Sequence, residues 1–157
     1  MYKNVLVPYD DPEELEVVLK SAIELVDSCD SASITVLAIV ERMGRYDQRF
    51  EVASKIAGIN LPSAEDEEKL TRAYKDMSRK EVQENIQQFF SKLPGTIDLK
   101  IEVVEGKVPE QVINYAEEHD IECIIMGRRL CGRIRGAVDS DLSAVMCGCD
   151  KPILTVK

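Results

Sequence analysis

The stretch EGKVPEQVINYAEEHDIECIIMG, residues 105–127, carries a helix pattern followed directly by a buried-strand pattern. In its first part, Val112 and Ala116 share one helix face, and Pro109 stands near the start of that helix. Its second part, IECIIM at 121–126, is a short and nearly continuous apolar run, which is typical of a strand covered on both faces. A helix that leads straight into such a strand indicates a crossover unit of a parallel sheet.

Four further apolar runs have the length and the Val and Ile content of strands. They are NVLVPY (4–9), ITVLAIV (34–40), IDLKIEVV (97–104) and PILTV (152–156). The run at 97–104 differs from the others because apolar and charged residues alternate along it. This alternation predicts one exposed face or an edge position.

Helical patterns lie between the strand candidates, at 15–26, 65–92, 108–119 and 138–149. Asp11 is suited to cap the first helix, Pro12 to begin it, and Glu14 to close a capping box. Strands that alternate with helices predict an α/β fold with an open, mostly parallel, Rossmann-like sheet. Right-handed crossovers then place helices on both faces of this sheet.

The 157 residues predict a single domain, 1–157, with one interruption of the strand–helix rhythm. Residues 41–63 are polar and carry arginines, with a short helix expected near Phe50 to Ala57. We interpret 41–63 as a solvated insertion, and the alternative is a lid over a site.

The composition and the start of the chain indicate a soluble protein. Hydrophobic residues make up 45% and charged residues 31% of the chain. No apolar run approaches the roughly 20 residues that span a bilayer, and the start MYKNVLVPYDD lacks the features of a signal peptide. We therefore expect a cytoplasmic protein that does not bind membranes. The net charge of −9 makes nucleic-acid binding by the whole surface unlikely.

Most catalytic and metal-binding patterns are missing from the sequence. It has no GxxxxGK[ST], no GxGxxG after a strand and no HExxH. The single histidine, His119, lies near a predicted helix end among acids and is expected on the surface. The five cysteines form no CxxC, which favours a reduced chain. Cys147-Gly-Cys149 leaves a redox or metal role open, although a zinc site needs a second pair of ligands, so we predict no metal cluster.

The candidate site lies at the carboxyl ends of the predicted strands. Ligands of open parallel sheets bind outside these ends, where the strand order reverses. Asp10 follows the first strand, Ile39 ends the second, and Met126-Gly127 ends the fourth. These patterns do not give the strand order, which decides which of the strand ends are neighbours.

At these positions the chain resembles the universal stress protein family. VLVPYDDPEE resembles the family's opening strand and first helix, EGKVPEQVINYAEEHDIECIIMG its helix and Met-Gly strand end, and CDKPILTVK its closing strand. The resemblance implies a five-stranded sheet of order 3-2-1-4-5, with the first and fourth strands at the switch point. It also implies a homodimer that pairs through the last strand, Pro152 to Val156.

The resemblance further implies a loop of pattern G-x2-G-x9-G-[ST] after the fourth strand in members that bind ATP or AMP. Gly127 matches the first glycine, whereas Leu130 stands at the second. With a one-residue deletion, inferred from aligning Pro152, Asp139 stands at the third glycine and Ser140 matches the final position. A bulky side chain and a negative charge therefore replace two phosphate-cradling glycines.

The adenosine half of the family's site is better matched. Asp10 matches the acid that faces the nucleoside, and Pro8, Ile39 and Met126 match apolar or backbone positions around it. Arg129 belongs to a set of arginines whose side chains could neutralise phosphate in place of the backbone. The set comprises Arg128, Arg129, Arg133 and Arg135.

These features favour a regulatory, homodimeric stress-response protein with an adenine-nucleotide site and no enzymatic activity. The alternative is a dimeric interaction protein that has lost nucleotide binding through Leu130 and Asp139. A weak ATPase is a third reading, although no positioned base or catalytic lysine is visible. The arginines could also bind an acidic partner or nucleic acid, or form a solvated loop on an acidic protein.

Overall fold

The protein is described by a computed structural model that covers residues 2–9, 12–26, 31–40, 55–58, 64–89, 97–127 and 141–156. Its strands are β1 (Asn4–Tyr9), β2 (Ala32–Val40), β3 (Ile97–Glu105), β4 (Cys123–Gly127) and β5 (Ile153–Val156). Its helices are α1 (Pro12–Val26), α3 (Ala64–Phe89), α4 (Val108–Glu118) and α5 (Asp141–Gly148), and residues 55–57 add a short helical turn.

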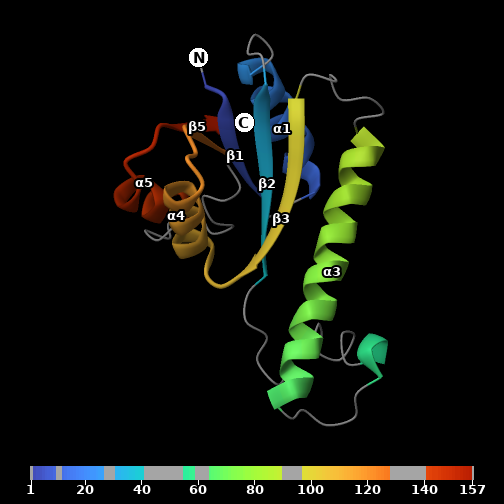
Figure 1. The fold of residues 1–157 in the computed structure, drawn as a ribbon. Coiled ribbons are helices and arrows are strands. Elements are labelled where there is room, and N and C mark those ends of the chain that lie inside the picture. The colour runs from blue at the N-terminus through green and yellow to red at the C-terminus, as the bar shows by residue number, and fades with distance from the viewer. Residues whose placement is uncertain are drawn as a thin grey trace.

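The five strands form one sheet in the order β3-β2-β1-β4-β5, and every strand pair in it is parallel (Figure 1). The predicted α/β class and the strand order implied by the family resemblance are both confirmed. The two expectations for 97–104 are also confirmed, because β3 is an edge strand and its charged side chains are the more exposed ones. Most of the predicted insertion or lid, at 41–54 and 59–63, lies outside the described residues.

The strand boundaries differ from the predicted ones where burial and pairing diverge. The apolar run at 121–126 predicts a start of β4 two residues before the observed one, at Cys123. The reason is that Ile121 is buried on the α4 side of the sheet without belonging to a strand. In contrast, β2 begins two residues earlier than predicted, at Ala32. The reason is that Ala32 and Ser33 pair with the start of β3.

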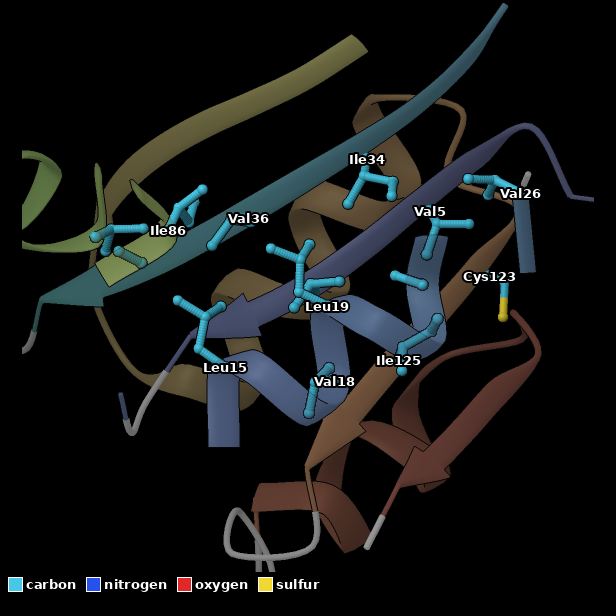
Figure 2. Packing of buried hydrophobic residues seen from close by; sticks show 14 of the residues in the cluster. Val5, Leu15, Val18, Leu19, Val26, Ile34, Val36, Ile86, Cys123 and Ile125 are labelled. Carbon is cyan, nitrogen blue, oxygen red and sulfur yellow. The ribbon is translucent and has the colours of Figure 1, made fainter. Parts of the chain in front are cut away.

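Two helical layers cover the two faces of the sheet. Helices α1 and α3 pack on one face, where Leu15, Val18 and Leu19 of α1 meet Val5 of β1 and Ile125 of β4 (Figure 2). Helices α4 and α5 pack on the other face, which is built from a second apolar cluster. That cluster comprises Leu6, Leu37, Val112, Ala116, Ile121, Ile124, Met126, Leu142 and Val145.

Helix α3 is longer than the sheet that it covers. Its 26 residues correspond to about 39 Å, whereas a nine-residue strand such as β3 spans about 30 Å. In Figure 1 the N-terminal part of α3 extends past the carboxyl ends of the strands. None of the described helices, α3 included, combines the length and the apolar character that a membrane crossing requires.

The start of β1 is tied to the residues that precede β4. The backbone N–H of Glu122 donates to the carbonyl of Asn4 at 2.9 Å, and the Glu122 carboxylate accepts the N–H of Lys3 at 2.5 Å. The hydrogen bond from Lys3 is the main reason why the pKa of Glu122 lies below its ordinary value. These bonds help to align the two central strands, β1 and β4.

Truncation of Leu19 tests the packing of α1. Leu19 is fully buried, so Leu19→Ala should lower the free energy of unfolding by about 2–5 kcal/mol in urea denaturation. The control is Val17→Ala on the same helix, because Val17 is 42% exposed and its truncation should change stability by about 0.5 kcal/mol or less. Equal losses for both variants would contradict the packing described here.

Candidate functional site

The two central strands create the point where the strand order reverses. From β1 the chain passes through α1 to β2 on one side, and from β4 it passes through α5 to β5 on the other. The two connections therefore diverge above the carboxyl ends of β1 and β4, which is where parallel α/β sheets open a ligand-binding crevice. By this general rule the candidate ligand position lies between Tyr9 and Gly127, at these two strand ends, and we call it the β1/β4 crevice.

Three of the predicted site residues share one face of the sheet near the crevice. Met126 is fully buried in the cluster under α4 and α5, and Ile39 packs against the same cluster. Pro8 is also buried and, by strand alternation, faces the same side as Leu6 of that cluster. Met126 has no exposed surface, so its side chain belongs to the core beneath the end of β4.

Gly127, the last residue of β4, faces the opposite side of the sheet, toward the first turn of α1. A Cβ atom built on Gly127 would lie 2.8 Å from Cδ of Glu14 and would overlap its Oε2. The half-buried Glu14 side chain therefore fills the space that the missing Cβ leaves. This contact brings a carboxylate to the edge of the β1/β4 crevice.

Other predicted site residues lie outside the described part of the chain. They are Asp10, Arg129 and Ser140, together with the two loop mismatches Leu130 and Asp139. Their chain neighbours are described: Tyr9 ends β1, Gly127 ends β4 and Asp141 begins α5. The structure thus gives the positions of Pro8, Ile39, Met126 and Gly127, and the binding roles of all seven predicted site residues stay predictions.

The sequence did not reveal a link between α3 and the end of β1. The side-chain amide of Asn85 donates to the hydroxyl of Tyr9 at 3.0 Å, across 76 residues of chain. In the sequence, Asn85 stands between Val82 and Ile86, two apolar residues of the α3 pattern that are buried. This position is the signal from which an inward-facing amide could have been inferred. This hydrogen bond helps to hold the residue directly before Asp10.

A polar group under α4 stands apart from the crevice. The Tyr115 hydroxyl of α4 forms a hydrogen bond with Thr35, in the middle of β2, and its ring stacks on exposed His119 with centroids 3.9 Å apart. Burial raises the pKa of Tyr115 and the nearby Glu102 carboxylate raises it further, whereas the bond to Thr35 lowers it. The interaction with Thr35 joins α4 to the sheet, whereas the stack on His119 lies within α4 and its C-cap. His119 is a surface residue, as predicted.

The described cysteines and acids form no metal site. Cys123, Cys147 and Cys149 are free thiols, and burial raises the pKa of Cys123. Within the described ranges, no group of three or more His, Cys, Asp or Glu side chains is arranged to hold a metal ion.

A model of the universal stress protein family matches residues 1–157. The chain belongs to the universal stress protein family. The sequence has no significant match among curated proteins.

Solved universal stress proteins share the fold. The universal stress protein from Lactobacillus plantarum is 18% identical, with a TM-score of 0.66 over 99% of this chain and 98% of its own. A universal stress protein from Archaeoglobus fulgidus, in complex with dAMP, is 16% identical, with a TM-score of 0.61 and coverages of 99% and 98%. A further universal stress protein, in complex with cAMP, is 15% identical, with a TM-score of 0.61 and coverages of 99% and 96%.

A double-mutant cycle tests the contact between Gly127 and Glu14. Gly127→Ala should reduce the free energy of unfolding by about 1–3 kcal/mol, because its Cβ meets the Glu14 side chain. Adding Glu14→Ala should recover part of this loss, with a coupling of at least about 0.5 kcal/mol. Gly148→Ala is the control, since its Cβ would meet Ile113 and should show no coupling to Glu14. Additive effects at Gly127 and Glu14 would disprove the contact.

Proposed function

We propose that this universal stress protein is a non-enzymatic regulator that binds an adenine nucleotide in the β1/β4 crevice. The observation that carries the proposal is the position of Pro8, Ile39, Met126 and Gly127 at the carboxyl ends of neighbouring strands. The relatives in complex with dAMP and cAMP support an adenine nucleotide as the ligand. In this proposal Asp10 binds the nucleoside, while Ser140 and Arg129 lie toward the phosphate.

The adenosine half of a nucleotide fits the β1/β4 crevice better than the phosphate half does. For the adenosine half, buried Pro8 and Met126 form the apolar core directly beneath the ends of β1 and β4, which would support a ligand lying over these ends. On the phosphate side, the space beside Gly127 is filled by the Glu14 side chain. AMP or a similar small nucleotide therefore suits the crevice better than an extended triphosphate.

Calorimetry with AMP, ATP and cAMP tests the proposed function. We expect at least one of these nucleotides to bind, with no phosphate released from ATP above a no-protein control. Asp10→Ala should weaken binding by about tenfold or more, because it removes a charged hydrogen-bond partner. The control is Asp120→Ala, at an exposed position after α4. Absence of binding by all three nucleotides at millimolar concentration would refute the proposal.

A second candidate function is an interaction protein without a nucleotide site. The observation that favours it is the Glu14 carboxylate at Gly127, together with Leu130 and Asp139 in the loop sequence. Failure of nucleotides to bind would support this candidate. Adenine nucleotide that copurifies in stoichiometric amount would rule it out.

We also propose that two copies pair through β5, the edge strand beside β4. Leu154 of β5 is 41% exposed, and an edge strand offers unpaired backbone groups to a second copy.

Leu154→Lys should shift the protein from dimer to monomer in sedimentation experiments, because a charge would be buried in the interface. Lys100→Ala on the opposite edge strand, β3, should leave the mass unchanged. A monomeric unmodified protein would refute the pairing.

A further inference from the structure

Two free thiols flank Gly148 at the end of α5. Cys147 belongs to the last turn of this helix and is exposed, whereas Cys149 follows the helix and packs partly against the apolar cluster under α4 and α5. The chain then enters β5 at Ile153, so both thiols lie toward the amino ends of the strands, away from the β1/β4 crevice. A small reagent in solution therefore reaches the Cys147 thiol first.

The helical geometry keeps the two thiols apart in the reduced protein. Residues two apart in a helix point in directions about 200° apart, and the different burial of Cys147 and Cys149 fits this divergence. The backbone N–H of Cys149 donates to the carbonyl of Val145 at 2.9 Å, so helical hydrogen bonding continues up to Cys149. By the same geometry the Cα atoms of the two cysteines are about 5.4 Å apart, which is within the range of disulfide-bonded pairs. A disulfide therefore needs a local change of the backbone, not the approach of distant segments.

Gly148 is suited to such a local change. It has no Cβ, so it reaches backbone conformations that other residues avoid, and it alone separates the two cysteines. In the reduced protein the same glycine allows α5 to lie close to α4, because a Cβ atom built on Gly148 would lie 2.7 Å from Cδ1 of Ile113. A disulfide across Gly148 therefore competes with the packing of α5 on α4.

We propose that Cys147 and Cys149 form a reversible dithiol–disulfide site that reacts with low-molecular-weight disulfides such as glutathione disulfide. The Cys147 thiolate attacks one sulfur of the reagent, whose S–S bond breaks and releases one glutathione thiol. The Cys149 thiolate then attacks the Cys147 sulfur of this mixed disulfide and releases the second glutathione thiol. The two protein thiols lose two electrons and two protons, which reduce the reagent to two thiols. The inference does not depend on the proposed nucleotide site.

Formation of this disulfide opens the last turn of α5. The two side chains project to different sides of the helix, so the bond forms only when the backbone of Cys149 moves. This movement withdraws Cys149 from the apolar cluster and separates its N–H from the Val145 carbonyl. Oxidation thus loosens the connection from α5 into β5.

Mass spectrometry of the full chain after treatment with glutathione disulfide tests the proposal. Cleavage by trypsin after Arg135 gives a C-terminal fragment, 136–157, whose only cysteines are Cys147 and Cys149. This fragment should become about two mass units lighter and resist alkylation, and dithiothreitol should reverse both changes. The Cys149 amide should exchange its hydrogen about tenfold faster or more in the oxidised protein, because its bond to Val145 is lost.

Two serine variants separate the two steps of the reaction. Cys149→Ser should stop at the mixed disulfide and retain one glutathione on Cys147. Cys147→Ser should react at least about fivefold more slowly, since the remaining thiol of Cys149 is half-buried. Cys131→Ser is the control and should leave the loss of two mass units unchanged. Thermal melts verify that each variant is folded.

The outcomes that would overturn the proposal are distinct. Thiols that stay unmodified in excess reagent would overturn it, as would stable glutathione adducts on both residues without the loss of two mass units. A disulfide from Cys147 or Cys149 to another cysteine, or to a second copy in non-reducing electrophoresis, would overturn it as well. Disulfide formation with unchanged hydrogen exchange at Cys149 would support the dithiol site and overturn the opening of α5.

Discussion

The parallel pairing of β1 with β4 is the constraint on which the rest of the structure depends. Val5 and Leu6 of β1 lie opposite Cys123 and Ile124 of β4, and all four residues are buried. Parallel strands require long crossovers, so each connection must return over a face of the sheet and carry its own apolar surface. The two helical layers follow from this requirement. So does the crevice, because the chain leaves β1 and β4 in opposite directions from adjacent ends.

The sequence was sufficient to predict the elements whose apolar residues follow the spacing of a strand or of a helix face. The Val- and Ile-rich runs identified all five strands, and the 3.6-residue spacing identified α1, α3, α4 and α5. The predicted strand boundaries were wrong where an apolar residue packs in the core without pairing with a neighbouring strand, as Ile121 does before β4. The order of the strands came from the family resemblance, since local pattern carries no information on which strands are neighbours.

The contacts that define the candidate site could not be predicted from local sequence, because they join residues far apart in the chain. Glu14 was expected only as a capping-box residue, whereas its side chain also packs against Gly127 of β4. Asn85 and Tyr9 are joined by a hydrogen bond of the same long-range kind. Gly127 illustrates the difficulty, since a matching motif glycine is read as space for a phosphate. In this chain an α1 carboxylate fills the space beside it.

The two edges of the sheet differ in a way that bears on how far copies of the chain can assemble. Edge strand β3 carries Asp98, Lys100 and Glu102, whereas edge strand β5 exposes Leu154. A sheet with two receptive edges would add a copy at each edge and grow into a fibre. The proposed pairing through β5 alone would close on itself, because the resulting pair would present only β3 edges. The charges along β3 would make these remaining edges unfavourable for the addition of a further strand, so the proposed assembly would stop at two copies.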